Sequence, residues 1–253
     1  MSKNEIFCIL RVKAKFFNMP NQVQKLLSDL KVASNSQKAK LLGGFFKSGK
    51  GQYGEGDIFL GIYVPIQRAI AKKYEGLEFN DLESLLKSKI HEHRLVALFI
   101  LVSKFKKGDN KIKEKIFKFY LKNIKGVNNW DLVDQSAPNI IGQWIQDKPK
   151  DILYKLARSN NLWEKRIAIL STLAFIREKK FEDTIKISEI LMNDKHDLIH
   201  KSVGWMLREV GKKEEAVLIK FLNKHTTKMP RTMLRYSIEK FNQETRKYYL
   251  CLK

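Results

Sequence analysis

Apolar residues recur at intervals of three and four positions along almost the whole chain after Val64. This period is typical of amphipathic helices that bury one face, and no segment shows the sustained alternation expected of strands. Glycines and prolines interrupt the pattern at short intervals. We therefore predict an all-α chain with helices over 21–33, 36–47, 64–75, 79–89, 92–106, 109–125, 129–145, 149–158, 162–178, 181–193, 196–210, 213–224 and 230–240.

A repeat predicts how these helices are arranged. Similar strings begin at Arg94, Trp130 and Arg166, each 36 residues after the one before, and another begins 35 residues later at Lys201. A period of about 35–45 residues with two helices per unit is typical of a HEAT-like α-solenoid. We expect one solenoid domain of stacked antiparallel helix pairs over residues 1–253. A generic helical bundle with coincidental spacing is the alternative.

The composition adds a strong positive charge to this picture. The 253 residues include 49 Lys+Arg and 27 Asp+Glu, a net charge of +22, and 43% are hydrophobic, which excludes bulk disorder. Such an excess needs a polyanion to balance it, and nucleic acid is the commonest one. We therefore expect a basic concave face, although a lysine-rich genome also produces some of this bias.

Several classes of protein are disfavoured. The longest uncharged apolar run, Leu95–Val102, is much shorter than the about 20 residues of a membrane span. The N-terminal apolar stretch 6–10 is too short for a secretory signal. Cys8 and Cys251 lie near opposite ends of the chain. We expect a monomeric, cytoplasmic, nucleoid-associated protein without disulfides or membrane contact.

The histidines do not predict a metal site. His196 and His200 share a helix face at the spacing of a zinc-protease helix, but no third ligand can be named. His91 and His93 also stand at a helix start. We expect all four imidazoles to be solvated, and we predict neither a metal nor a cofactor.

One segment departs from the helical pattern. Seven of the 13 glycines lie in residues 43–61. The string over 49–54 satisfies the letters of a dinucleotide-binding fingerprint, but a helix precedes it where a strand is required. We expect a flexible, Gly-rich surface loop whose backbone N–H groups, with Lys47 and Lys50, suit phosphates. A mere connector is the alternative, and the role of Tyr53 stays open.

Two tryptophans are predicted to lie beside charged side chains on the same helix face. In the predicted helix 196–210, Trp205 lies opposite the apolar stripe and shares its face with Lys201 and Arg208. An aromatic ring between two cations suits a phosphate chain and a sugar or base. A neighbouring repeat that covers this face is the alternative.

The second tryptophan lies beside a carboxylate. Trp130 and Asp134 are four residues apart on one helix side, and Asn128 or Asn129 caps that helix. Pro138 cannot donate to the carbonyl of Asp134, so the helix should loosen there. A structural salt bridge is the ordinary reason for a half-buried carboxylate.

The string Asn129–Asp134 resembles the hallmark of the AlkD-like HEAT-repeat family of bacterial alkylpurine DNA glycosylases. Further matches follow in order at 59–61, 64–65, Arg68, 162–166 and 204–208, so the resemblance covers about residues 21–240. The Gly-rich insertion before Phe59 and the basic C-terminal end, 241–253, map least well onto the family.

The resemblance implies a function and a set of roles. Duplex DNA with alkylated purines would lie on the concave face, where Trp130 and Trp205 flank the damaged nucleotide. Asp134 would be the catalytic carboxylate, and Arg166 would grip the backbone. The implied activity is monofunctional hydrolysis of the N-glycosidic bond of cationic N3- or N7-alkylpurines, without extrusion of the base.

Two other functions remain open on the sequence. A non-catalytic HEAT-repeat protein could bind bent, branched or damaged DNA through the same basic groove. A protein-binding scaffold could carry its lysines only for solubility. The preferred lesion, and any lysine that would give lyase activity, are not predicted.

Overall fold

The computed structural model describes residues 22–252, and Cys8 and the apolar stretch 6–10 fall outside this range. Within it the regular structure is helical, with a single isolated parallel bridge between Ile58 and Ile90. The α-helices follow in the order α2 (Gln22–Val32), α3 (Ser36–Phe45), α4 (Val64–Lys73), α5 (Phe79–Leu86), α6 (His91–Lys107), α7 (Asn110–Lys122), α8 (Trp130–Ala137), α9 (Gln143–Ile145), α10 (Asp151–Ala157), α11 (Leu162–Ser171), α12 (Leu173–Arg177), α13 (Glu182–Leu191), α14 (Asp197–Lys213), α15 (Glu215–His225), α16 (Arg231–Ser237) and α17 (Gln243–Cys251).

The predicted helices all occur, with three differences. A π-helical turn, Pro138–Gly142, separates α8 from α9. This turn confirms the loosening expected from Pro138, which lacks the donor that an α-helix requires there. The predicted helix 162–178 is divided at Thr172 into α11 and α12. Helix α17 occupies most of the basic C-terminal end, where no helix was predicted.

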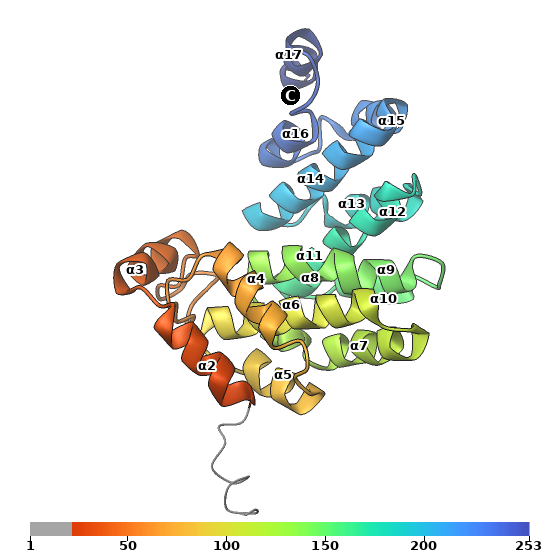
Figure 1. Ribbon diagram of the computed structural model, residues 1–253. Coiled ribbons are helices and arrows are strands. Elements are labelled where there is room, and N and C mark those ends of the chain that lie inside the picture. Colours follow the sequence, from red (N-terminus) through yellow and green to blue (C-terminus); the bar gives the residue numbers. More distant parts are fainter. Residues whose placement is uncertain (1–21, 253) are drawn as a thin grey trace, which may run out of the picture.

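The helices stack as successive pairs, which confirms the all-α solenoid (Figure 1). Helix α6 packs on α8, α8 on α11, and α11 on α14. The four repeated strings lie on these same four helices, so equivalent repeat positions are neighbours in space. Helices α13–α17 continue the stack away from the first half of the chain (Figure 1).

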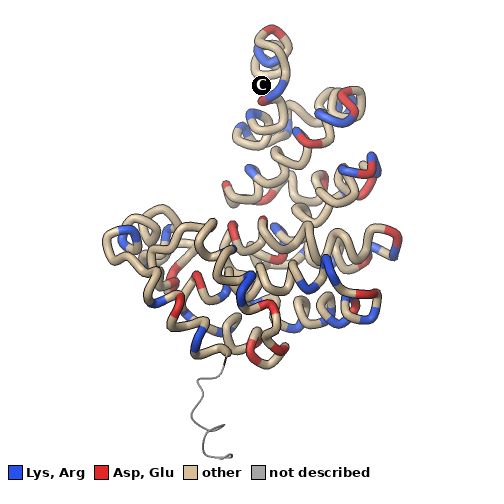
Figure 2. The backbone as a smooth tube through the Cα atoms, in the orientation of Figure 1, with Lys and Arg blue, Asp and Glu red and all other residues tan. Residues whose placement is uncertain are grey.

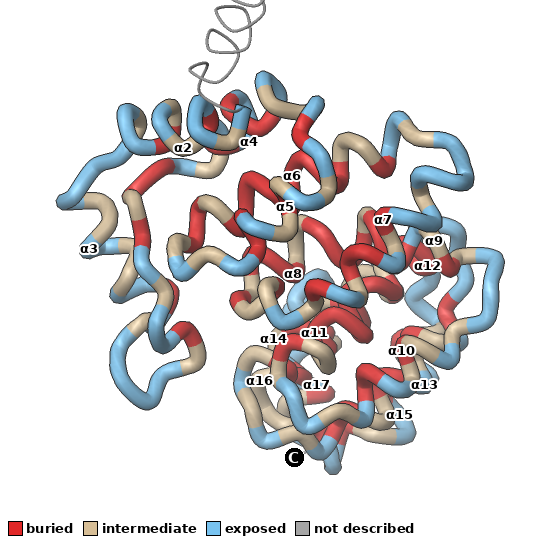
Figure 3. The backbone as a smooth tube through the Cα atoms, turned by 90° about the horizontal axis from the view of Figure 1, so that it is seen from below, coloured by how far each residue is buried: buried red, intermediate tan, exposed pale blue. Residues whose placement is uncertain are grey.

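The core follows the inner helices and leaves the connections exposed (Figure 3). Most of α6 is buried, and Leu98 and Ile100 within it are fully inaccessible. Lys and Arg are found on most helices and are not confined to one stripe (Figure 2). The basic concave face expected from the sequence therefore stays a prediction.

No helix in residues 22–252 has both the length and the apolar character needed to cross a membrane. Cys251, the cysteine within this range, is exposed and has a free thiol.

Candidate active site

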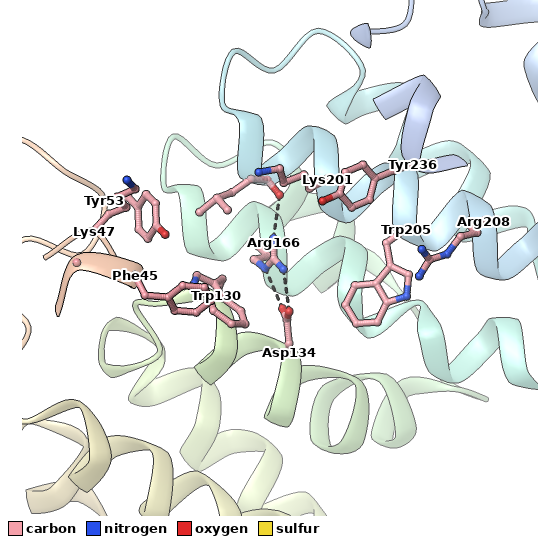
Figure 4. Close-up of a pocket in the computed structure, with 12 residues that line it drawn as sticks. Phe45, Lys47, Tyr53, Trp130, Asp134, Arg166, Lys201, Trp205, Arg208 and Tyr236 are labelled. Carbon is pink, nitrogen blue, oxygen red and sulfur yellow. Dashed lines mark hydrogen bonds and ion pairs between the residues drawn. The ribbon is translucent and has the colours of Figure 1, made fainter. Parts of the chain in front are cut away.

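A pocket of about 640 Å³ opens where α8, α11 and α14 meet the end of α3 and the Gly-rich loop (Figure 4). Its walls combine aromatic rings, four basic side chains and one carboxylate. The lining residues are Gly44, Phe45, Lys47, Tyr53, Trp130, Asp134, Arg166, Leu198, Lys201, Trp205, Arg208 and Tyr236. Seven of the eight site residues predicted from sequence thus meet in one cavity, and Lys50 does not line it.

Asp134 and Arg166 form a bidentate ion pair at the floor of the pocket (Figure 4). Arg166 donates from Nε to Oδ1 and from Nη2 to Oδ2, both at 2.8 Å, and from Nη1 to the Leu198 carbonyl at 2.8 Å. Burial raises the pKa of the Asp134 carboxyl above its usual value, although the charge and hydrogen bonds of Arg166 oppose that shift. The salt bridge considered from sequence therefore exists, and it lies inside the pocket.

This ion pair limits the hydrogen-bond donors that Arg166 could offer to DNA. Its side chain is 6% exposed, and all three guanidinium nitrogens already donate to protein oxygens. Arg166 thus fixes the orientation of the Asp134 carboxylate. The direct grip on the DNA backbone expected of Arg166 stays a prediction.

Trp130 is placed by the cap of its own helix. Asn129 accepts a hydrogen bond from the Trp130 backbone N–H at 2.9 Å, so the cap is Asn129 and not Asn128. The indole stacks on Phe46, with ring centroids 5.0 Å apart and planes 13° apart. Phe45 meets the same indole edge to face at 5.8 Å, so the ring is held from two sides.

Trp205 faces the pocket from α14 with Lys201 and Arg208, the grouping predicted from helical periodicity (Figure 4). Its indole Nε1 donates to Glu209 at 3.2 Å. Arg208 pairs with Glu209 and with Glu239, and Lys201 pairs with Asp197 at 2.7 Å. Helix α16 packs beside this face, but Lys201, Trp205 and Arg208 all still line the pocket.

Gly204 explains how Tyr236 reaches the pocket. A Cβ at Gly204 would lie 2.5 Å from the Cβ of Tyr236 and 2.6 Å from the Met233 carbonyl oxygen. Only glycine therefore allows α14 and α16 to approach this closely. The close approach places Tyr236 beside Trp205 at the edge of the cavity.

The Gly-rich loop is partly a wall of the pocket and not simply a surface loop. Lys47 and Tyr53 line the cavity, while Lys50 is exposed away from it. Gly54 lies where a Cβ would approach the Phe46 carbonyl oxygen to 2.4 Å, so the loop folds tightly back on itself. The loop rejoins the core where buried Glu92 accepts hydrogen bonds from the backbone N–H groups of residues 60–62.

The prediction that His91 is solvated is wrong. The residue is 2% exposed, and its two ring nitrogens contact Asp57 at 3.1 Å and Asp131 at 2.8 Å. His93 is partly buried, and burial together with Arg94 lowers its pKa to about 4. The loop folds over the start of α6, and this contact has no signature in the sequence around His91.

His196 and His200 have local structural contacts. The Nδ1 of His196 accepts from the Leu198 N–H at 3.1 Å and caps α14, and His200 Nε2 contacts the Asp194 carbonyl. Within residues 22–252, no cluster of three His, Cys, Asp or Glu side chains could hold a metal ion.

Two aromatic residues of the pocket, Phe45 and Tyr236, were not predicted from the sequence. Phe45 is 63% exposed at the cavity, and Tyr236 is 36% exposed. Both are brought to the pocket by tertiary contacts between distant segments, at the loop and at the α14–α16 crossing. An aromatic residue beside a Gly-rich loop was the only available signal for Phe45.

Together, the fold and the pocket define an α-solenoid with one aromatic cavity that combines a buried acid with several cations. The model of the DNA alkylation repair enzyme family matches residues 26–241. The chain therefore belongs to the family of DNA alkylation repair enzymes.

The solved structures agree on the fold. The structure of a predicted DNA alkylation repair enzyme from Enterococcus faecalis matches with a TM-score of 0.65 at 16% sequence identity. The match covers 83% of this chain and 97% of that chain. At this identity the likeness concerns the fold alone. The comparison with curated proteins gives no match.

Proposed function

We propose that this protein is a monofunctional DNA glycosylase that releases purines alkylated at N3 or N7. The observation that carries the proposal is the position of the Asp134 carboxylate, which lines a pocket between the Trp130 and Trp205 indoles. Family membership supports a DNA substrate and an enzymatic role. The substrate class and the role of each residue are those that the resemblance to the AlkD-like family implies, and the chemistry of the pocket supports them.

A purine alkylated at N3 or N7 carries a positive charge, so its N-glycosidic bond is already weak. When that bond breaks, its electron pair returns to the purine, which departs neutral without a general acid. Positive charge then develops at C1′, and a nearby carboxylate stabilises it. Water adds to C1′ and loses its proton to solvent. Asp134 supplies the negative charge, and the indoles stabilise a cationic base or sugar by about 1–2 kcal/mol each.

The basic residues of the pocket suit the DNA backbone. Lys47, Lys201 and Arg208 line the cavity around the acid, and the side chains of Lys201 and Arg208 are 41% and 18% exposed. These cations attract phosphates through a salt-dependent, sequence-independent interaction. Binding of the backbone at the rim would bring a deoxyribose toward Asp134 at the floor.

The test is base release from a duplex that contains 7-methylguanine, detected as alkali-sensitive abasic sites. Asp134→Asn keeps the shape of the side chain but removes its charge, and we expect the rate to fall by about 10²–10³. Asp147→Asn is the matched control, because that carboxylate is 80% exposed in a surface ion pair and does not line the pocket. No release above spontaneous depurination, or full activity in Asp134→Asn, would reject the proposal.

One observation favours a second candidate, a non-catalytic binder of damaged or bent DNA. Both oxygens of Asp134 already accept hydrogen bonds from Arg166, as expected of a structural ion pair. This candidate predicts salt-sensitive binding of duplexes with no base release. The same assay, combined with a binding measurement at low salt, separates the two functions.

A further inference from the structure

Four rings form a cluster that extends from the pocket wall into the protein interior. The indole of Trp130 stacks on Phe46 at 5.0 Å, and Phe46 stacks on Phe59 at 5.1 Å. The imidazole of His91 contacts both phenylalanine rings: it stacks on Phe59 at 4.7 Å and meets Phe46 at 4.9 Å in a tilted arrangement. Trp130 is the ring of this cluster that lines the pocket, and His91, which does not line it, contacts the Phe46 ring on which Trp130 stacks.

His91 joins two segments that are distant in sequence. Its Nδ1 lies 3.1 Å from Asp57 at the end of the Gly-rich loop, and its Nε2 lies 2.8 Å from Asp131, the residue after Trp130. Carboxylates only accept hydrogen bonds, so both ring nitrogens must donate, as they do in the imidazolium form. The histidine therefore ties the loop to the first turn of α8.

The charges around the ring also require a proton on it. The charged groups that face His91 are Asp57 from the loop, Asp131 from α8 and Arg94 from its own helix. Arg94 donates to Asp57 at 2.6 Å and balances only one of the two carboxylates. Protonated His91 balances the second, whereas neutral His91 would leave a buried negative charge without compensation.

The pKa of His91 is consistent with this balance. Burial by itself would lower the pKa of the imidazole, but the hydrogen bonds and charge of the two aspartates outweigh burial and raise it to about 9. Because the pKa in the folded state lies above the ordinary value of 6.5, the contribution of the charged bridge to the free energy of unfolding is fully present below pH 6.5. The stabilisation that it provides is lost as the pH rises through about 9.

We propose that His91 is a positioning residue, which as an imidazolium holds the loop, Phe46 and α8 together and so fixes the orientation of the Trp130 indole. The bridge is fully formed at neutral pH and opens in alkali. Its effect on the rate of base release rests on the glycosylase function proposed above. Its effect on the indole does not depend on that function.

The first experiment needs no substrate. The His91 imidazole and the Trp130 indole N–H are followed by NMR in the full-length wild-type protein from pH 6 to 10.5. We expect His91 to titrate near pH 9 and the indole resonance to shift with the same midpoint. A His91 pKa at or below 6.5, or an indole signal that does not respond to the His91 titration, overturns the inference.

The second experiment measures base release from 7-methylguanine duplex under single-turnover conditions, with an enzyme-free blank at each pH. His91→Gln keeps a hydrogen-bonding side chain but cannot carry charge. Because displacement of a positioned group by about 1 Å costs up to about 100-fold, we expect a rate constant roughly 10–100-fold lower and a smaller change in half-saturating concentration. The wild type should lose activity as the pH rises through about 9, and the variant should lack this alkaline limb.

His225→Gln is the matched control. His225 also pairs with a carboxylate, Glu189 at 2.9 Å, and packs on the ring of Phe221 at 4.6 Å, but it lies outside the pocket. We expect its rate constant and pH profile to equal those of the wild type. Equal losses in the two variants would contradict a specific positioning role. If His91→Gln does not fold, the wild-type NMR titration and pH profile decide.

The outcomes separate this inference from the proposed function. If base release depends on Asp134 but is unchanged in His91→Gln, the inference about His91 is wrong and the proposed function is unaffected. A wild-type protein that releases no base, but whose Trp130 signal follows His91, rejects the glycosylase function. It supports His91 as the residue that positions the indole.

Discussion

The pocket presents two indoles on walls of different construction. The Trp130 wall, formed by α3, the loop and α8, is supported by the Phe46 stack and by the buried His91 bridge. The Trp205 wall, formed by α14 and α16, depends on a hydrogen bond to Glu209 and on partly exposed ion pairs of Arg208. Burial fixes the first wall, whereas surface charges that salt can screen orient the second.

Arg166 joins the two walls. It donates to Asp134 on α8 and to the Leu198 carbonyl on α14, and its side chain is almost inaccessible. One guanidinium group thus contacts both of the helices that carry the indoles. Substitutions of Arg166, of Phe46 behind Trp130 and of Glu209 beside Trp205 test this difference between the walls.

The largest effect is expected for Arg166→Ala. The substitution leaves the Asp134 carboxylate buried without a partner, and removal of one member of a buried ion pair costs about 3–5 kcal/mol. Urea unfolding measures the loss of stability, and the base-release assay measures the accompanying loss of rate. Lys165→Ala is the control, since Lys165 pairs with Asp194 outside the pocket and is more exposed. If Arg166→Ala loses no more stability than Lys165→Ala, Arg166 does not hold the two walls together.

The second-largest effect is expected for Phe46→Ala, because the Phe46 ring supports the Trp130 wall. Phe46 is 7% exposed, and truncation of a buried aromatic ring to alanine costs about 3–5 kcal/mol. For Phe46→Ala we expect a loss toward the lower end of that range, because the ring lies near the pocket, together with a slower rate of base release. Thermal unfolding and the same assay check both. A stable Phe46→Ala variant of full activity would show that the stack does not support the indole.

The smallest effect is expected at the support of the Trp205 wall. Glu209→Gln removes the charge that pairs with Arg208 and Lys212, both partly exposed. Such pairs contribute about 0–1 kcal/mol, so stability should barely change. Activity should fall by a few fold at low salt and match the wild type in about 0.5 M NaCl, where these pairs are screened. A loss that does not depend on salt would show that both walls are held in the same way.

The two walls also differ in how far the sequence predicts them. Trp205, Lys201 and Arg208 lie on one helix, so a period of 3.6 residues suffices to place them on one face. The Trp130–Asp134 pair follows from the same periodicity, and the repeat brings these helices side by side. Local pattern therefore predicts each of these two groupings, whereas their meeting in one site with Arg166 was predicted only by the resemblance to the AlkD-like family.

The loop half could not be predicted, because it depends on contacts between distant segments. His91 was predicted to be solvated because it begins a helix. Asp57 lies beside it only once the loop has folded over α6. Helix α17 was missed for a related reason. Tyr249 is its one buried residue, so it has almost no apolar stripe to detect.

The 36-residue repeat has a consequence for how such a pocket can change. Trp130 and Asp134, then Arg166, then Lys201 and Trp205 come from three consecutive units at equivalent positions. Each unit contributes its own part of the chemistry, so exchange of α14 alone could alter the Trp205 wall and spare the Trp130 wall, whereas α11 carries the guanidinium that contacts both. Insertion of a whole unit between α8 and α11 would instead separate the acid from its guanidinium by the thickness of a layer. Laboratory recombination of this scaffold should therefore keep the order of these three units and vary the units outside them.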